Sequence, residues 1–324
     1  MTFIDDDLPK TALDWHRAGR GVAVATVVQT WGSSPRPIGS QLVVDADGAM
    51  AGSVSGGCVE GAVVTEAVDA IADGLPRVLE FGVSDDQAFA VGLACGGKIR
   101  VLVEPVGHAL PIDVLERLVA ARDRAEPVAY VTDLAGGGSR LVGASSYPDR
   151  FRLDQSGVME DGHTFVAVHN PPLRLVVVGA VHIAQPLVAM ARACGFRPTL
   201  IDPRAAFGSE DRFPGEVILA DWPDEALRSL NLDARTAVVT LTHDPKLDDP
   251  AIVTALESPI FYLGSLGSKR THAKRVERLK AVGFTDQEIA RIHAPVGLDI
   301  GGRHPAEIAL SIMAQITQTL RKAK

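Results

Sequence analysis

The second half of this 324-residue chain repeats one pattern, a short apolar run followed by a segment with helical spacing. The apolar runs are LRLVVVG, PTLID, EVILA, TAVVTLT and IFYLG, and the chain ends in an amphipathic segment over Pro305–Arg321. Entirely apolar strands that alternate with helices are typical of a parallel sheet whose two faces are both covered. We therefore predict an α/β protein with a C-terminal doubly wound, Rossmann-like parallel sheet domain.

The first half of the chain predicts a mixed α/β domain. Strands are expected over GVAVATVVQT, 77–81 and 98–105, with a hairpin at Asp47-Gly48 and a helix that follows SGGC and stops at Gly74. Pro171 and Pro172 cannot continue a hydrogen-bonded ladder, so we place the domain boundary there. The expected domains are residues 1–170 and 171–324, which suits the usual domain length of roughly 150 residues.

Composition and charge exclude several protein classes. Thirty-two Lys and Arg residues against 40 Asp and Glu residues give a net charge of −8, which argues against a surface that follows a nucleic-acid backbone. Three cysteines are too few, and odd in number, for a secreted disulfide framework. The start, MTFIDDDLPK, lacks the pattern of a signal peptide, and no apolar stretch reaches the roughly 18 residues of a membrane span. We expect a cytoplasmic protein with no nucleic-acid or membrane partner.

Two cysteines lie beside glycine pairs, in SGGCVEG and ACGGK. These motifs comprise Gly56, Gly57 and Cys58, and Cys95, Gly96 and Gly97. Glycines let a bulky ligand approach the backbone, and a helix that starts at Cys58 would lower the pKa of its thiol. Both cysteines are therefore candidate metal ligands. The alternative, a small buried apolar side chain, suits Cys194 in the run AMARACG better.

The first strand of the second domain runs into a turn that partly matches a dinucleotide-binding fingerprint. Gly179 occupies the first glycine position, and Asp202 ends the next strand. Val181 stands where the second glycine would let pyrophosphate approach the backbone. NAD binding in the usual pose is therefore not expected, and an ordinary turn of a nucleotide-type fold is the alternative.

A second glycine-rich loop lies between a predicted strand and a predicted helix, in FYLGSLGSKRTHAKR. Backbone N–H groups, hydroxyls and adjacent cations converge in such a loop, which favours binding of an anion such as phosphate. Its candidate residues are Gly264, Ser265, Gly267, Ser268, Lys269 and Arg270. The alternative is a solvated helix face on which Ser268 is merely the N-cap.

Taken together, these motifs resemble a known family. The motifs are WGSSPRPIGS, GSVSGGCVEGAVV, LACGGKIRVLVEP, VVVGAVHIAQPL, IDPR, LTHD, YLGSLGSKRTHAKR and APVGLDIGGRHPAEIALSI. The chain is similar to the xanthine dehydrogenase accessory family of the XdhC/CoxI type. The resemblance implies a protein that binds the molybdenum cofactor (molybdopterin), protects it during sulfuration, and supports its insertion into a molybdenum hydroxylase of the xanthine dehydrogenase type.

The resemblance also assigns site positions. Cys58 and Glu60 match the family's Cys-Val-Glu motif, and Cys95 matches its Cys-Gly-Gly motif. The remaining matches are Gly179 and His182 in the Gly-x-Gly-His turn and Arg204 in IDPR. The chain departs from the family at Val181, which replaces the second glycine of that turn.

Three hypotheses follow. The leading one is a cofactor chaperone without turnover of its own, with Cys58 and Cys95 at the metal end and the second domain holding the polar tail. A homodimer and a cysteine desulfurase as sulfur donor are the further partners we consider. The second hypothesis is an NAD-type nucleotide-dependent oxidoreductase, and the third is an assembly platform that binds no ligand.

Overall fold

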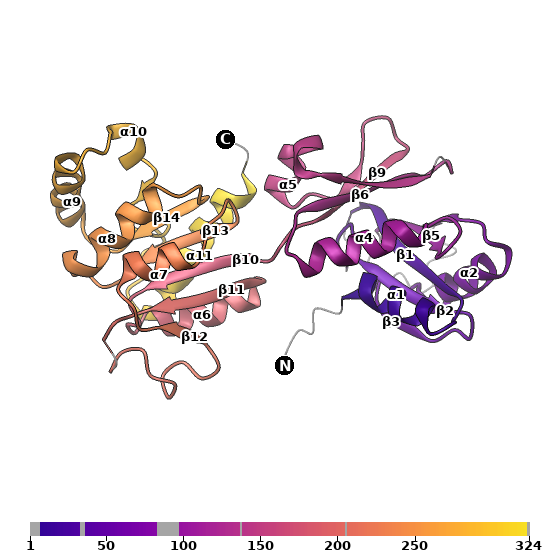
Figure 1. Cartoon of the computed structure of the whole chain (residues 1–324), viewed down its shortest axis with the longest axis horizontal. Coiled ribbons are helices and arrows are strands. Elements are labelled where there is room, and N and C mark those ends of the chain that lie inside the picture. The colour runs from indigo at the N-terminus through magenta and orange to yellow at the C-terminus, as the bar shows by residue number, and fades with distance from the viewer. Residues whose placement is uncertain (1–6, 33–35, 83–96, 137, 205, 323–324) are drawn as a thin grey trace. The chain divides into compact units, whose positions relative to one another are not determined.

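The computed structural model describes residues 7–32, 36–82, 97–136, 138–204 and 206–322. The chain divides into two compact units, Met1–Pro171 and Pro172–Lys324 (Figure 1).

A five-stranded sheet in the order β3-β2-β1-β5-β4 is the first layer of the N-terminal unit. Its strands are β1 (Val22–Trp31), β2 (Gln41–Asp45), β3 (Met50–Gly52), β4 (Arg77–Phe81) and β5 (Lys98–Pro105), all paired antiparallel. The helices that cover it are α1 (Leu8–Arg17), α2 (Glu60–Asp73) and α4 (Ile112–Asp123). Because side chains alternate along a strand, Ala23 and Ala25 of β1 pack with α2, whereas Val22 and Val24 pack with α1 and α4.

A four-stranded antiparallel sheet completes this unit, in the order β7-β6-β9-β8. Its elements are β6 (Val128–Asp133), β7 (Ser139–Gly143), the 3₁₀ turn η1 (Ala144–Ser146), α5 (Pro148–Leu153), β8 (Gly157–Val158) and β9 (Thr164–His169). Tyr130 and Phe165 join the core that contains α4, and Val131 and Val166 pack with Phe151 of α5. The two sheets of the unit therefore share one core.

The C-terminal unit is built on a six-stranded parallel sheet in the order β12-β11-β10-β13-β14-β15. Its strands are β10 (Leu173–Val178), β11 (Phe196–Ile201), β12 (Val217–Leu219), β13 (Thr236–Thr240), β14 (Tyr262–Ser265) and β15 (Ile292–His293). Its helices are α6 (Ala184–Ala193), α7 (Pro223–Ser229), α8 (Pro245–Leu256), α9 (Lys269–Ala281), α10 (Asp286–Ile289) and α11 (Pro305–Arg321). The strand order reverses between β10 and β13, which is the position where this fold class binds ligands.

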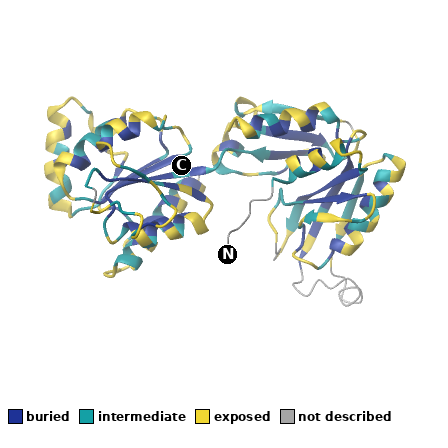
Figure 2. Cartoon of the chain, turned by 60° about the horizontal axis from the view of Figure 1, so that its bottom comes forward, coloured by how far each residue is buried: buried dark blue, intermediate teal, exposed yellow. Residues whose placement is uncertain are grey.

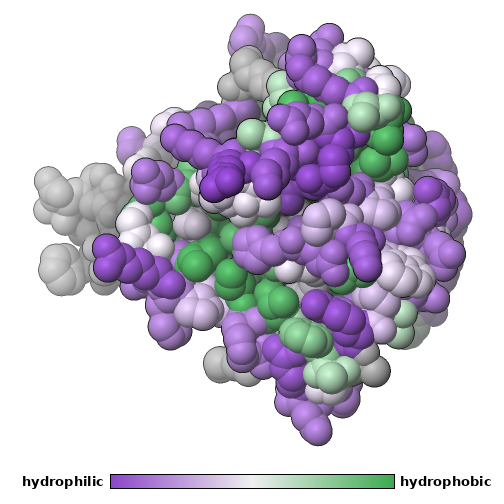
Figure 3. Space-filling model, turned by 90° about the vertical axis from the view of Figure 1, so that its left-hand side faces the viewer, coloured by the Kyte–Doolittle hydropathy of each residue, from purple (hydrophilic) through white to green (hydrophobic). Residues whose placement is uncertain are grey.

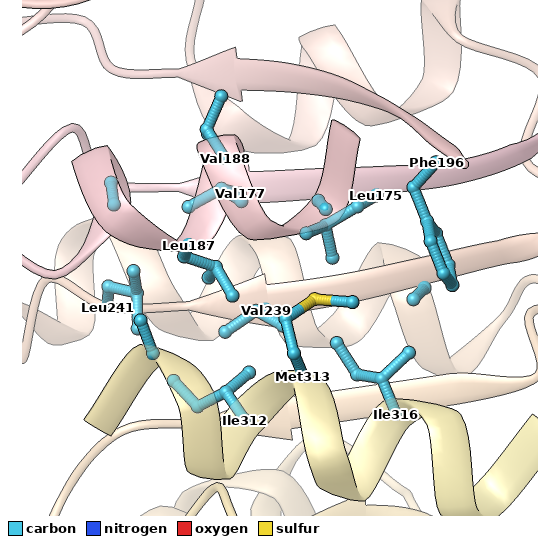
Figure 4. Close-up of a cluster of buried hydrophobic side chains, with 14 of the residues drawn as sticks. Leu175, Val177, Leu187, Val188, Phe196, Val239, Leu241, Ile312, Met313 and Ile316 are labelled. Carbon is cyan, nitrogen blue, oxygen red and sulfur yellow. The ribbon is translucent and has the colours of Figure 1, made fainter. Parts of the chain in front are cut away.

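Helices cover both faces of the parallel sheet, and its strands are largely buried (Figure 2). Leu175 and Val177 of β10 face α6 and α11, where they meet Leu187 and Ile312 (Figure 4). The alternate residues of β10 face the opposite side and pack with α7 and α8. Each large aliphatic side chain that is fully buried in this way contributes about 2 kcal/mol to stability.

These observations confirm the predicted fold class, including the doubly wound C-terminal sheet. The helix that follows SGGC and stops at Gly74 is also confirmed, and Gly74 ends it in the left-handed conformation. Among the described elements, the short η1, α5, β8, α10 and β15 were not predicted. Among the helices of the described residues, none is both long and apolar enough to cross a membrane.

Candidate functional site

Cys58 lies in the loop that joins β3 to α2. Gly56 and Gly57 precede it with φ angles of 74° and 112°, a backbone region that glycine adopts without strain. The space that a Cβ of Gly57 would fill is open. Cys58 is half-buried, is not in a disulfide, and packs on one side against the α2 core. The loop therefore presents one sulfur atom beside bare backbone.

The carboxylate of Glu60, the first residue of α2, holds this loop. Its Oε1 accepts hydrogen bonds from the Ser53 hydroxyl at 2.7 Å and from the N–H groups of Val54 and Ser55 at 3.2 and 2.9 Å. Its Oε2 accepts from the Ser55 hydroxyl at 2.5 Å and from the N–H of Gly57 at 2.8 Å. Both oxygens are therefore engaged by the loop itself.

These bonds also fix the charge of Glu60. Burial alone would raise its pKa, but the hydrogen bonds from Ser55, Ser53 and the loop amides outweigh burial and lower the pKa from 4.5 to about 2. The negative charge also lies at the N-terminus of α2, where the helix dipole favours it. In this motif Glu60 holds the loop, and Cys58 is the side chain that the loop presents.

The second predicted cysteine motif is only partly described. Cys95 and Gly96 lie outside the described residues, and Gly97 is buried directly before β5. Within the part of the chain that the structure describes, no cluster of three or more His, Cys, Asp or Glu side chains is arranged to hold a metal ion.

Gly179 follows β10 at the point where the strand order reverses. Its φ is 104°, and a Cβ there would lie 2.6 Å from Cγ2 of Thr242, so both backbone and packing require glycine. Val181 is half-buried against the core and accepts the N–H of Ala184 at 2.9 Å through its carbonyl. His182 is exposed. Gly179, the first glycine of the fingerprint, is therefore required by its close contact with Thr242 in the loop after β13.

Asp202, at the end of β11, is buried and fully bonded. It accepts from the N–H of Ala180 at 2.9 Å and from Nε and Nη2 of Arg204 at 2.8 and 2.7 Å. Burial would raise the pKa of Asp202, but the Arg204 and Ala180 bonds outweigh burial and lower it. Arg204 in turn lies 4.0 Å above the ring of Phe207. The carboxylate thus ties the first turn to the loop after β11.

The structure divides the second glycine-rich loop into two parts. Gly264 and Ser265 belong to strand β14 and are buried. A Cβ on Gly264 would lie 2.5 Å from Cγ2 of Val296, and the Ser265 hydroxyl lies 2.6 Å from that of Thr240. These two residues therefore pack the sheet interior.

The other part lies at the exposed N-terminus of α9. Ser268 is the N-cap and accepts the N–H of Thr271 at 3.1 Å. Lys269 and Arg270 follow it and are exposed. Hydrophilic side chains cover most of the face of the C-terminal unit seen in Figure 3. Gly267, Ser268, Lys269 and Arg270 form one continuous polar segment, which we call the α9 loop.

Several buried charged side chains were not expected from the sequence, among them Asp45, Glu104, Asp248 and Arg275. Glu104 of β5 is 4% exposed, and Arg275 of α9 is 2% exposed, with its Nη2 3.6 Å from Oδ2 of Asp248. Arg275 precedes the buried Leu279 by four residues, a spacing that puts both on one helix face and could have indicated its burial. The corresponding signal for Glu104 is its place in the apolar run VLVEP.

Comparison with known proteins identifies the family. Residues 15–82 match the XdhC and CoxI family model, and residues 175–316 match the XdhC Rossmann domain model. The chain is 31% identical over 320 residues to the molybdenum cofactor insertion chaperone PaoD of Escherichia coli (strain K12), covering 98% of this chain and 90% of that protein.

Two further matches extend over nearly the whole chain. A probable xanthine dehydrogenase subunit of Bacillus subtilis (strain 168) is 27% identical over 316 residues, with 92% of this chain and 93% of that protein covered. A crystal structure from Bacillus halodurans, described as a xanthine dehydrogenase, matches with a TM-score of 0.72 and 28% identity, covering 100% of this chain and 97% of that one. The chain therefore belongs to the XdhC and CoxI family.

Proposed function

We propose that this protein binds a molybdenum cofactor as cargo, supports its sulfuration, and supports its insertion into a molybdenum hydroxylase of the xanthine dehydrogenase type. The name of the Escherichia coli relative, a molybdenum cofactor insertion chaperone, supports this proposal over 98% of the chain. Cargo binding and release need no turnover, so we assign the chain no catalytic residue.

The observation that carries the proposal is the glycine loop that Glu60 fixes around Cys58. A thiolate is a soft ligand that suits a thiophilic metal centre such as molybdenum. Gly57, the residue before Cys58, leaves open space where a side chain would stand, so a bulky cargo can approach the backbone of the loop. Since both oxygens of Glu60 are engaged by the loop, we assign Glu60 a positioning role and Cys58 the contact with the metal.

We include Cys95 as a second sulfur ligand because its motif mirrors that of Cys58 in sequence. Gly97, which ends that motif, directly precedes β5, and β5 is the neighbour of β1 in the same sheet. A pair of thiolates could hold the metal without a donor from outside the N-terminal unit.

For the C-terminal unit we propose a role in holding the phosphate-bearing tail of the cargo. The α9 loop offers the N-terminus of a 13-residue helix with Lys269 and Arg270 in its first turn, a combination that attracts phosphate. Gly179 and His182, beside the strand-order reversal, are proposed as the second contact region for this tail.

The direct test is cofactor retention by the purified full-length protein. Molybdopterin content is measured in the wild type and in Cys58→Ala, Cys95→Ala and Cys194→Ala variants. Cys194, which the sequence predicts to be a small buried side chain, is instead an exposed free cysteine at the end of α6, and it serves as the matched control. We expect loss of at least about tenfold in Cys58→Ala, since one metal–thiolate bond is removed, and full retention in Cys194→Ala. Full retention in both Cys58→Ala and Cys95→Ala would overturn the sulfur-ligand assignment.

Two other outcomes would replace the proposal. Micromolar binding of NAD would favour a nucleotide-dependent oxidoreductase. Equal capture of the hydroxylase by cofactor-loaded and cofactor-free protein would favour an assembly platform. Cross-linking in cell extract tests the cytoplasmic partners we propose, namely the hydroxylase, a cysteine desulfurase and a second copy of this chain.

A further inference from the structure

A cavity of about 560 Å³ lies within the N-terminal unit, away from the Cys58 loop. Its walls come from β4, β5, β6, the turn before α4 and the turn between β6 and β7. Its volume falls in the range of small-molecule sites, roughly 300–1,000 Å³. Gly74, the C-cap of α2, lines it, whereas Cys58 precedes the N-terminus of the same 14-residue helix. The two places are therefore about 20 Å apart along the helix.

Glu104 and Thr132 supply the polar wall of this cavity. Oε1 of Glu104 accepts the Tyr130 hydroxyl at 2.6 Å and the Thr132 hydroxyl at 3.2 Å. Both bonds go to Oε1, so Oε2 keeps its capacity to accept. Thr132 uses its only hydroxyl proton on Glu104, so its oxygen is left as an acceptor. Glu104 and Thr132 both line the cavity and are 4% and 5% exposed.

The charge of the lining selects the kind of ligand. The described lining residues include the carboxyl groups of Glu104 and Asp133 and the imidazole of His108, but no Lys or Arg. A phosphate group would find no Lys or Arg among these lining residues, and the two carboxyl groups would oppose its charge. A flat ring with two adjacent N–H donors would meet two adjacent acceptors, and Val78 and Leu102 would contact its apolar faces.

We propose that this cavity binds a free heterocycle with a 2-amino-4-oxopyrimidine edge, the edge shared by pterins and guanine. Its ring N–H and exocyclic amino group donate to Oε2 of Glu104 and Oγ1 of Thr132. The site is separate from the cargo site, because the metal of molybdopterin lies close to its own pterin and one cofactor cannot span both. This separation rests on the proposed function, which puts the metal at Cys58, whereas binding of the free heterocycle is measured apart from molybdopterin retention, so either result can fail without the other.

Protonation of Glu104 controls this site. Burial raises the pKa of Glu104 from 4.5 to about 7, although the Tyr130 and Thr132 bonds oppose the rise. The other titratable groups that face it are Tyr130 from β6 and, along the cavity, Asp133 and His108. Only the ionised carboxyl offers both oxygens as acceptors, so affinity for the heterocycle rises as Glu104 loses its proton.

The test uses the full chain and the intrinsic fluorescence of two probes. Pterin carries the 2-amino group, and lumazine carries an oxygen in its place. Guanine, as competitor, distinguishes a purine-type from a pterin-type ligand. We expect lumazine to bind at least about tenfold more weakly than pterin, because its oxygen would face an acceptor. We also expect pterin affinity to rise about fivefold between pH 6 and pH 7, a range in which Glu104 loses its proton while pterin keeps its own ring N–H.

Three variants separate the possible causes. Glu104→Gln keeps the size of the side chain and should weaken pterin binding at least about tenfold and abolish its pH dependence. Thr132→Val should weaken pterin binding but keep its pH dependence. Cys58→Ala should leave pterin binding at this cavity unchanged. Wild-type affinity in Glu104→Gln, equal binding of pterin and lumazine, or no binding of either pterin or guanine to the wild type would each overturn the proposal.

Discussion

Replacing Glu60 with Gln tests how the Cys58 loop is held. The amide would point N–H donors at the Ser55 hydroxyl or the Gly57 N–H, which donate to Oε2 in the wild type. The bonds lower the pKa of Glu60 from 4.5 to about 2, and a lowering of that size is worth about 3 kcal/mol at neutral pH. Since Glu60 is 6% exposed, solvent screens little of this stabilising free energy. We expect Glu60→Gln to lower the free energy of unfolding at pH 7 by about 2–3 kcal/mol.

The pH dependence of the free energy of unfolding shows whether the ionised form of Glu60 is the stabilising one. A folded-state pKa below the unfolded value contributes stability that is present above about pH 4.5 and is lost as the pH falls toward 2. Urea unfolding of the N-terminal unit can be followed by fluorescence of Trp15 and Trp31 in a Trp222→Phe background. The deficit of Glu60→Gln should shrink between pH 5 and pH 2.5. Glu66→Gln, on the same helix and 44% exposed, is the control and should change stability by less than about 0.5 kcal/mol. A Glu60→Gln deficit that stays constant with pH, or that matches the control at pH 7, would refute the reasoning.

Three further predictions concern other positions. Burial raises the folded-state pKa of Glu104 from 4.5 to about 7, so the wild type loses stability as the pH rises through that window and Glu104 ionises. Glu104→Gln cannot ionise. We therefore expect it to raise the free energy of unfolding, measured in urea, by about 3 kcal/mol at pH 8 and to leave it unchanged at pH 4. Gly179→Ala should cost about 2 kcal/mol or more, because φ is 104° and the new Cβ would lie 2.6 Å from Thr242; Gly195→Ala, with a φ of 80° and open space, controls for backbone strain alone in the same urea assay. Cys58→Ala should keep the thermal midpoint within about 3 °C while cofactor retention falls, as followed by calorimetry and molybdopterin assay.

The parallel sheet was predictable because its strands are short, largely apolar runs that alternate with helical segments. That pattern forces burial on both faces, and both faces are indeed covered by helices. The six-residue helix α5 was not predictable, because its one buried side chain, Phe151, is fixed by packing against β6 and β9. Short polar elements of this kind depend on tertiary contacts that no local pattern records.

At the candidate site, too, the sequence pattern alone does not show which single residues are buried by tertiary contacts. The sequence groups Gly264 and Ser265 with the α9 loop, because a Gly-Ser run after a strand is typical of an anion site. In the structure β14 continues through both, since Gly264 leaves room for Val296 and Tyr262 to approach. Where a strand ends depends on such neighbours. The burial of Glu104 likewise depends on Tyr130, 26 residues further along the chain.

Three of the buried carboxyl groups, Glu60, Asp202 and Glu104, differ in how many donors surround them, and this difference separates groups that hold the structure from a group able to bind a ligand. Glu60 accepts three backbone N–H bonds and two hydroxyl bonds, and Asp202 accepts backbone N–H and guanidinium bonds, so both keep a lowered pKa and have their oxygens engaged. Glu104 receives two hydroxyl bonds on one oxygen, so burial prevails and its pKa is raised. Carbon-13 NMR of the side-chain carboxyls should therefore show Glu60 and Asp202 unchanged between pH 5 and pH 9 and Glu104 titrating near pH 7. A Glu104 signal that titrates near pH 4.5 would mean that its oxygens are already satisfied, and the cavity would lose its recognition group.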